Sequence, residues 1–394
     1  MKICIIVDDY MPNSIKIAAK MMHELALEFI KNGHEVSVLT PDTKINDKLQ
    51  IDTLDGVTIY RFKSGEIKNV SKIKRAINET LLSYNGWTAC KDELVKNRHD
   101  LIIYYSPTIF FGSLVKKLKK LWEAPSYLIL RDIFPQWVID NNILKEDSLI
   151  TRYFKYFETI NYKNANTIGL MSEKNLLWFN KKYKNMYQTE VLYNWTSNVA
   201  LRNITKDYRK ELNLDNKVIY FYGGNMGQAQ DMLNLLKLAK NMLNDEQAHF
   251  LFVGTGDEID IMKNYIMKEK LTNTTMLPSV NQKEFLNILS QIDVGLFSLN
   301  CNHTTDNFPG KLLGYMCESK PILGSINPGN DLKKVVEDAN AGLISTNGED
   351  ELLYTNAKYF LNEKNRLTIG TNANKLLQKK FSVETAVEKI LASF

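Results

Sequence analysis

Residues 2–7 read KICIIV, and the pattern that follows this run decides the fold. A short run that is apolar at nearly every position is typical of a parallel strand buried on both faces. Apolar residues then recur at helical spacing. They are Ala18, Met21, Met22, Leu25, Ala26 and Phe29. Gly33 is predicted to end this helix, and the next strand is expected over residues 35–39. The beginning of the chain therefore predicts a strand–helix–strand unit.

The same alternation continues along the chain in two blocks. Strands of the first block are predicted at residues 57–61, 101–105, 127–130, 168–171 and 190–193. Strands of the second block are predicted at 218–222, 249–253, 275–277, 294–298, 321–324 and 342–345. Helical patterns lie between them, which favours mostly parallel sheets with helices on both faces. We predict an α/β fold with two doubly wound, Rossmann-like domains, at residues 1–196 and 207–380, joined by a polar linker.

Composition agrees with this organisation and excludes several classes of protein. A chain of 394 residues suits two domains, and 44% hydrophobic with 24% charged residues is near the globular average. The four cysteines are scattered, as in a protein of a reducing compartment. No window of about 18 uncharged apolar residues exists, so a cytoplasmic location is expected. The net charge of +5 permits an anionic partner without requiring one, and nucleic acid is not expected.

Two glycine-rich stretches follow predicted strands of the second domain. In open α/β sheets, ligands bind beyond the carboxyl ends of the strands. Glycines there allow close approach of a ligand, and a following helix N-terminus favours phosphate. The candidate donor-binding residues in these stretches are Gly223, Gly224, Asn225, Gly227, Gly254 and Gly256. The alternative is that these glycines only form tight turns before capped helices.

Residues 307–316, NFPGKLLGYM, carry the strongest local signal. Pro309 and Gly310 stand where a helix would begin, and Lys311 falls in its first turn. A cation in that position opposes the helix dipole, which makes sense if Lys311 faces a bound diphosphate. Phe308, Pro309, Gly310 and Leu312 are candidate donor-binding residues around it. The alternative is an exposed loop lysine.

Two further candidates lie in the first domain. Arg131 and Asp132 follow the strand at 127–130, where they could approach the sugar or the attacking hydroxyl, although a structural ion pair is an equal alternative. The loop with Pro12, Asn13 and Ser14 could contact the acceptor, or Ser14 could merely cap the first helix.

Lysines and aromatic residues are interleaved on several predicted helices of the first domain. The helix after Thr108 carries Lys116, Lys117, Lys119, Lys120 and Trp122, and similar clusters occupy residues 152–163 and 181–184. Such surfaces can rest on anionic lipid headgroups. For any one helix, the alternative is solvated lysines on an ordinary outer face.

Other chemistries lack their sequence signatures. There is no Asp-x-Asp pair after a strand, the five histidines form no zinc pattern, and no Gly-x-Ser-x-Gly elbow occurs. Neither metal catalysis nor serine hydrolysis is expected, and no cofactor is predicted.

The chain resembles family 4 glycosyltransferases over nearly its full length. The resemblance is carried by KNGHEV at 31–36, VLYNW at 191–195 and the Gly254–Gly256 turn. Two stretches are similar to the WbuB-like branch, which is associated with L-fucosamine transfer in surface polysaccharide synthesis. They are RDIFP at 131–135 and residues 307–316, and the second is followed by KPILGS at 320–325 and PGND at 328–331.

The resemblance implies a GT-B fold, in which two Rossmann-like domains face a central cleft. It also implies a UDP-sugar held by the second domain, retention of anomeric configuration, and a C-terminal helix, here residues 383–394, that packs back on the first domain. The two glutamates common in the family fall on Asp306 and Gly314, and Gly314 has no side chain to hold a ribose. The loop at 225–230 lacks the cations common in the family, so Lys311 is expected to carry more of the diphosphate charge.

The sequence thus predicts a retaining, metal-independent glycosyltransferase. The expected donor is UDP-N-acetyl-L-fucosamine and the expected acceptor a polyprenyl-diphosphate-linked saccharide of O-antigen or capsule synthesis, met at the inner face of the membrane. One alternative is a UDP-sugar 2-epimerase of GT-B shape, although His303 and its neighbouring carboxylates do not suit that reaction. The others are a two-lobed binding protein and a nicotinamide dehydrogenase. The first is usually exported and the second carries a dinucleotide fingerprint after its first strand, and this sequence shows neither an export signal nor the fingerprint.

Overall fold

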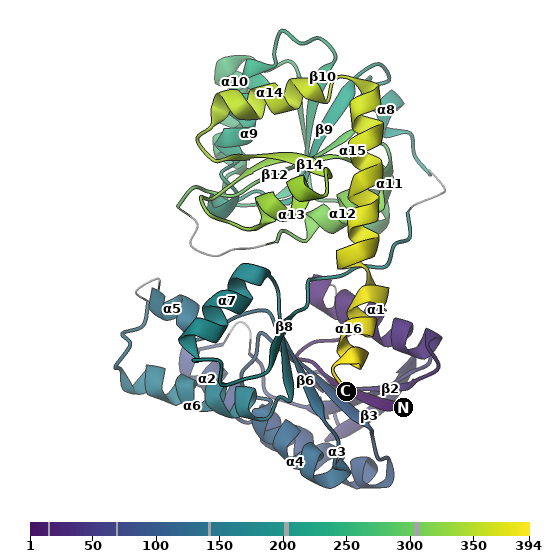
Figure 1. Ribbon diagram of the computed structural model, residues 1–394, viewed down its shortest axis with the longest axis vertical. Helices are drawn as coiled ribbons and strands as arrows, with labels where there is room; N and C mark the ends of the chain where they lie inside the picture. Colours follow the sequence, from purple (N-terminus) through teal and green to yellow (C-terminus); the bar gives the residue numbers. More distant parts are fainter. Residues whose placement is uncertain (15, 68–69, 141–142, 201–204, 303–307) are drawn as a thin grey trace. The chain divides into compact units, whose positions relative to one another are not determined.

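The computed structural model describes the whole chain except residues 15, 68–69, 141–142, 201–204 and 303–307. The chain forms two compact units (Figure 1). The first comprises Met1–Thr196 and Val383–Phe394, and the second comprises Ser197–Ser382. The second unit begins before residue 207 because the chain is already attached to it there. The amide of Thr205 donates to Asn287 Oδ1, and that of Tyr208 donates to Gln291 Oε1, each at 2.9 Å.

The first unit is built on an eight-stranded sheet in the order β3-β4-β2-β1-β5-β6-β7-β8. Its strands are β1 (Lys2–Ile6), β2 (Glu35–Asp42), β3 (Leu49–Leu54), β4 (Val57–Lys63), β5 (Leu101–Ser106), β6 (Ser126–Leu130), β7 (Thr167–Leu170) and β8 (Thr189–Val191). The antiparallel strand β3 was not predicted. Its turn to β4 is Asp55-Gly56, where both residues have positive φ, as a two-residue hairpin requires.

Helices cover both faces of this sheet. They are α1 (Ile17–Lys31), α2 (Lys72–Thr80), α3 (Leu82–Lys96), α4 (Gly112–Trp122), α5 (Gln136–Asp140), α6 (Leu149–Lys163), α7 (Glu173–Lys182) and α16 (Val383–Ala392). Figure 1 shows α1 and α16 on one side of the sheet and α3, α4 and α6 on the other. Alternate residues of β1 serve the two sides: Ile3 and Ile5 belong to one hydrophobic cluster, and Cys4 and Ile6 to the other. Such two-sided burial explains why β1 is apolar from Ile3 to Ile6.

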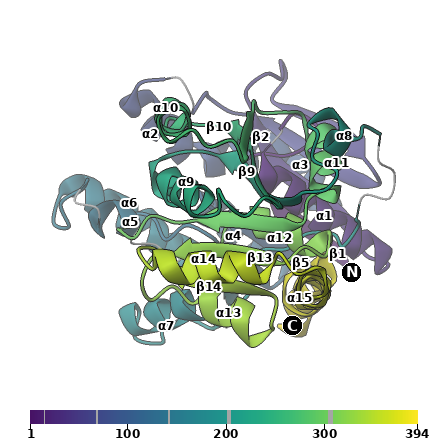
Figure 2. The same cartoon turned by 90° about the horizontal axis from the view of Figure 1, so that it is seen from above.

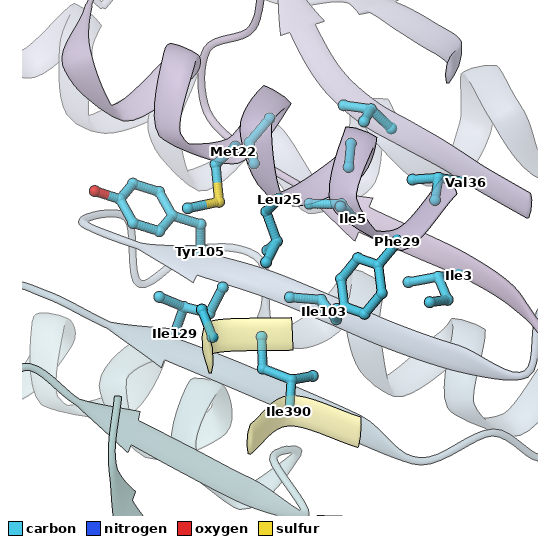
Figure 3. Close-up of a cluster of buried hydrophobic side chains, with 14 of the residues drawn as sticks. Ile3, Ile5, Met22, Leu25, Phe29, Val36, Ile103, Tyr105, Ile129 and Ile390 are labelled. Carbon is cyan, nitrogen blue, oxygen red and sulfur yellow. The ribbon is translucent and has the colours of Figure 1, made fainter. Parts of the chain in front are cut away.

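The C-terminal helix α16 belongs to the first unit although it follows the second in sequence. Ile390 is fully buried in the same cluster as Ile3, Ile103 and Phe29 (Figure 3). The Lys389 ammonium donates to the Val191 carbonyl at 2.7 Å, at the end of β8. Helix α16 therefore completes the hydrophobic core formed by α1 and the sheet.

The second unit holds a six-stranded parallel sheet in the order β11-β10-β9-β12-β13-β14. Its strands are β9 (Val218–Asn225), β10 (Ala248–Thr255), β11 (Thr274–Leu277), β12 (Val294–Ser298), β13 (Ile322–Ile326) and β14 (Gly342–Thr346). Its helical segments are α8 (Tyr208–Glu211), η1 (Gln228–Gln230), α9 (Met232–Asn241), α10 (Ile259–Glu269), α11 (Gln282–Ser290), α12 (Lys311–Cys317), α13 (Leu332–Asp338), α14 (Asp350–Tyr359), α15 (Glu363–Leu376) and η2 (Leu377–Phe381).

These helices also lie on two sides of their sheet. Figures 1 and 2 show α9, α10 and α14 on one side and α11, α12 and α15 on the other. The predicted α/β class, with two Rossmann-like units, is confirmed. Among the described residues, no helix has both the length and the apolar character needed to cross a membrane.

Candidate functional site

The candidate donor site lies at the carboxyl ends of β9 and β10 in the second unit. Both strands extend further than predicted, so Gly223, Gly224 and Gly254 belong to strands rather than to turns. Gly224 pairs with Gly254 in the parallel ladder. A Cβ on Gly254 would lie 1.9 Å from the Gly224 carbonyl oxygen, so a side chain cannot be accommodated there. The glycines therefore allow the two strand ends to approach closely.

Three more candidate glycines are also explained by close packing. A Cβ on Gly256 would lie 2.0 Å from the Met226 carbonyl oxygen, and one on Gly227 would lie 2.6 Å from Asp257 Oδ1. A Cβ on Gly223 would meet the Phe285 ring at 2.5 Å. Gly223 thus permits close packing at the end of β9, and Gly227 and Gly256 permit it in the loops that follow β9 and β10.

Gly224 and Gly310, in contrast, have room beside them. A Cβ on Gly310 would meet nothing within 4 Å, and one on Gly224 would have Lys311 Cε and Nζ as its nearest atoms, both at 3.9 Å. The fold thus brings Gly224 and Lys311 together, although they are far apart in sequence.

Lys311 is the first residue of α12, and its ammonium lies over an aromatic ring. Lys311 Nζ is 3.3 Å from the centroid of the Tyr222 ring. The side chain reaches this ring across the end of β9, where Gly224 has no side chain to obstruct it. Tyr222 is itself fully buried and donates its hydroxyl to the Asn225 carbonyl at 2.5 Å.

The ammonium of Lys311 is partly buried, and no described carboxylate pairs with it. Burial lowers the pKa of Lys311 from 10.5 to about 7. A desolvated cation without an anionic partner binds anionic oxygens favourably, because an added anion restores the interactions that water no longer supplies. The carboxyl end of β9 can therefore receive a phosphate or diphosphate.

The region directly after the glycines differs from the prediction. The turn leads into η1, and α9 begins only at Met232. The Met232 amide donates to Glu258 Oε2 at 3.1 Å, so a carboxylate already occupies the start of α9. Only the short 3-10 helix η1 follows the glycine turn directly, and the predicted phosphate site at a helix N-terminus stays a prediction.

The remaining donor-side candidates support the site in different ways. Asn225 is exposed and donates from Nδ2 to Gln230 Oε1 at 2.9 Å. Phe308 and Leu312 are buried, and Phe308 lies 6.0 Å from Phe381 between ring centroids. Pro309 is half-buried beside Lys311. Asp306, Asn307 and His303 lie outside the described residues.

Gly314, at the position of the expected ribose-binding glutamate, lies close to α11. A Cβ on Gly314 would lie only 3.0 Å from Leu289 Cδ2 of α11. Glycine at this position thus permits close packing of α12 on α11.

In the first unit, Arg131 follows β6 and points into the protein. Its guanidinium donates to the carbonyls of Leu130, Gly169 and Tyr193 at 3.2, 3.4 and 3.3 Å. It also lies over the Trp195 ring, 5.6 Å from the centroid. Burial lowers the pKa of Arg131 to about 10. Arg131 therefore holds the ends of β6 and β7 and the segment after β8 together.

Asp132 differs from Arg131 although it is the next residue. It is exposed at the carboxyl end of β6, and partial desolvation raises the pKa of its carboxyl group. No ion pair is formed between Arg131 and Asp132 in the described structure. The Asp132 carboxylate is thus accessible at the strand end.

The loop that follows β1 is fixed by a buried arginine that the sequence analysis missed. Arg61 of β4 donates to the Met11 carbonyl at 2.5 Å and to Asp52 Oδ2 at 2.9 Å. Asn13 Nδ2 donates to Asp42 Oδ2 at 3.0 Å, and Pro12 lies between these two attachments. Arg61 could not be identified from sequence because its position in a strand suggests a surface residue.

Ser14 is not the N-cap of the first helix, which was one of the two roles considered for it. The N-cap of α1 is Lys16, and Ser14 Oγ accepts a hydrogen bond from the Lys16 amide at 3.2 Å. The Ser14 hydroxyl stabilises the turn before the helix instead.

The basic helix α4 uses its apolar residues in the core. Phe111, Leu114 and Leu118 are fully buried, and the Lys119 ammonium donates to Asn166 Oδ1 at 2.6 Å. Lys117 lies over the Trp87 ring, 5.1 Å from the centroid. Helix α4 thus presents lysines but no large apolar side chain to solvent.

Among the described residues, no three or more His, Cys, Asp or Glu side chains are placed so that they could hold a metal ion.

The fold is that of GT-B structures, with two Rossmann-like units. No protein-family model matches the chain. The chain is similar to the probable glycosyltransferase WbjE of Pseudomonas aeruginosa, with 20% identity over 268 residues. The match covers 67% of this chain and 66% of WbjE, just under two thirds of that relative.

Solved structures resemble the chain over nearly its whole length. Sucrose-phosphate synthase of Thermosynechococcus elongatus has a TM-score of 0.71 at 15% identity, covering 99% of this chain and 97% of that one. HepE of Anabaena, in complex with UDP, has a TM-score of 0.65 at 15% identity, covering 100% of this chain and 99% of that one. At these identities the likeness establishes the fold.

Proposed function

We propose that this chain is a glycosyltransferase that takes its sugar from a UDP-sugar. The observation that carries the proposal is the Lys311 ammonium, partly buried over Tyr222 and beside Gly224, without a described carboxylate partner. The similarity to WbjE and the UDP and UDP-glucose complexes of HepE support the same activity.

The reaction follows from the charge that must be stabilised. When the bond between the sugar and the diphosphate breaks, negative charge grows on the leaving phosphate oxygen. We propose that Lys311 stabilises that charge, strongly because the site is partly desolvated. One lysine can fulfil the role that a divalent ion has in other transferases, so we propose metal-independent transfer.

The acceptor side is assigned to the first unit. The exposed Asp132 carboxylate is the group proposed to approach the attacking hydroxyl. Arg131 acts as a positioning residue, because its guanidinium binds main-chain carbonyls. The loop with Pro12, Asn13 and Ser14 is proposed to contact the acceptor, fixed in place by Arg61.

The identity of the substrates is proposed from the sequence resemblance. The donor is UDP-N-acetyl-L-fucosamine, transferred with retention of configuration. The acceptor is a polyprenyl-diphosphate-linked saccharide of O-antigen or capsule synthesis, reached from the cytoplasmic face of the membrane. Anomeric configuration of the product, read by NMR, tests retention independently of the donor.

Transfer assays with Lys311→Ala test the central step. Turnover should fall about 10²–10³-fold, the range typical for loss of one preorganised charge-stabilising group, while the melting temperature stays near that of the wild type. Lys263→Ala, at an exposed position of α10, is the matched control and should be fully active. Normal turnover of Lys311→Ala would remove Lys311 from the mechanism.

Two further experiments test metal independence and distinguish transfer from epimerisation. Loss of activity in EDTA with recovery in manganese would contradict metal independence. Incubation with UDP-N-acetylglucosamine alone distinguishes transfer from epimerisation, because an epimerase converts this compound without any acceptor.

A further inference from the structure

Exposed apolar side chains of the first unit gather on α2, the start of α3, and α6. Ile73 and Ile77 are four residues apart on α2, which places them on one face of that helix, and Leu81 and Tyr84 follow at the junction with α3 and at its start. Ile73 is 75% exposed and Leu149 of α6 is 81% exposed. We refer to this surface as the α2–α6 face. It consists of Ile73, Ile77, Leu81, Tyr84, Leu149, Ile150, Tyr153 and Tyr156.

Helix α2 has the reverse of the usual arrangement for a surface helix. None of its described side chains is buried, and its isoleucines face solvent. It is held by polar contacts instead: Asn78 Nδ2 donates to the Glu66 carbonyl at 2.7 Å, and the Thr80 and Tyr153 hydroxyls are hydrogen-bonded. The last contact joins the end of α2 to Tyr153 of α6. Exposed apolar side chains that gather on neighbouring helices in this way indicate a binding partner.

Basic residues outnumber acidic residues beside this face. Residues 72–84 and 145–156 contain six basic and three acidic residues. Arg75 pairs with Glu79 and Lys155 with Glu146, at 2.9 and 3.4 Å. Lys74 and Arg152 are exposed and have no described carboxylate partner. The partner should therefore be apolar at its centre and anionic around it.

We propose that the α2–α6 face docks on an anionic lipid bilayer. Protruding isoleucine and leucine side chains would enter the acyl region, tyrosines would lie at the headgroup level, and Lys74 and Arg152 would contact lipid phosphates. A second copy of the chain fits less well, because two cationic faces would repel each other. The choice of a lipid partner also rests on the lipid-linked acceptor proposed above.

Co-sedimentation with vesicles tests the proposal on the full chain. The wild type should bind vesicles of phosphatidylcholine with phosphatidylglycerol more tightly than vesicles of phosphatidylcholine alone. The variant Ile73→Ser/Ile77→Ser/Leu149→Ser/Ile150→Ser should bind at least about tenfold more weakly, because it removes the inserting groups. Lys74→Glu/Arg152→Glu should abolish the preference for anionic vesicles. Ile261→Ser/Met267→Ser, at exposed positions of α10, is the matched control and should bind as the wild type does.

The outcomes separate docking from catalysis. Both α2–α6 variants should keep the wild-type melting temperature and should transfer sugar normally to a water-soluble acceptor. Failure of the transferase proposal would leave vesicle binding intact. Vesicle binding that is absent in the wild type, or unchanged in the fourfold variant, would overturn the proposal. So would a wild-type dimer that the same variant dissociates.

Discussion

Lys311 Nζ lies 3.3 Å from the centroid of the Tyr222 ring, so an aromatic face and not a carboxylate holds this ammonium. The difference matters for a binding site. A carboxylate would neutralise the cation and compete with an incoming anion. The face of an aromatic ring attracts a cation through its quadrupole while leaving the net positive charge available. Tyr222 thus orients the Lys311 ammonium without neutralising its charge.

Donor binding should weaken as the pH rises through about 7. Burial lowers the pKa of Lys311 to about 7, so the free protein carries this charge below that pH and loses it above. Calorimetric titration with UDP between pH 6 and 9 should show dissociation constants that increase with pH. Lys311→Arg remains charged over this range and should flatten the dependence. An equally steep dependence in Lys311→Arg would assign it to another group.

Stability of the unliganded protein should change with pH in the opposite direction. The unfolded chain keeps the Lys311 proton up to about pH 10.5, whereas the folded protein releases it near pH 7. Between these values the unfolded state binds more protons, so this group's contribution raises the free energy of unfolding as the pH rises. Urea unfolding at pH 7 and 9 should show a larger increase for the wild type than for Lys311→Met. An equal increase in the two proteins would contradict the assignment.

Substitution of Tyr222 should separate the ring from its hydroxyl. Tyr222→Phe keeps the aromatic face under Lys311 and should bind UDP within a few-fold of the wild type. Tyr222→Leu removes that face and should weaken UDP binding by roughly 3- to 30-fold, since cation–π contacts contribute about 0.5–2 kcal/mol. Circular dichroism melting of both variants controls for the buried position of the residue. Equal UDP affinities for the two variants would exclude an orienting role of the ring.

Much of the fold was predictable because buried parallel strands have a distinctive sequence. Residues 3–7 are apolar throughout because β1 is covered on both faces. The hairpin β3–β4 was missed although Asp55-Gly56 signals it, since the alternation in residues 49–54 was not recognised as a strand. The ends of β9 and β10 were misplaced because Gly224 and Gly254 were interpreted as a break, whereas their pairing continues the ladder.

The site was predictable only in part, for a related reason. Lys311 was detectable because a cation in a first helical turn conflicts with the dipole. Its partner Tyr222 was not detectable, because nothing in the sequence of an apolar strand indicates which side chain from another element lies over its end. Arg131 was expected near the acceptor, but its three carbonyl contacts depend on how β6, β7 and the segment after β8 converge. Such convergence is set by tertiary packing and not by local sequence.

Glycine substitutions should distinguish packing from ligand contact. Gly254→Ala places a Cβ 1.9 Å from a carbonyl oxygen, so the strands must separate. We expect a loss of about 1–3 kcal/mol in unfolding free energy, with a melting temperature lower by several degrees. Gly310→Ala, where nothing lies within 4 Å, is the matched control and should melt as the wild type does. Equal melting temperatures for the two variants would refute the close approach of β9 and β10.

The neighbours Arg131 and Asp132 should give opposite phenotypes. Arg131→Met leaves three main-chain carbonyls without the guanidinium donor, because the methionine side chain cannot donate hydrogen bonds. The free energy of unfolding should fall by about 1–3 kcal/mol, the cost of buried acceptors left unsatisfied. Asp132→Asn keeps the size of an exposed side chain and should melt normally, but turnover should fall at least tenfold if the carboxylate meets the acceptor hydroxyl. Thermal melting and transfer kinetics on the two variants check both expectations. If Arg131→Met were stable but inactive, the carbonyl contacts would contribute little to folding. Arg131 would then take part in the reaction and would not merely support the strand ends.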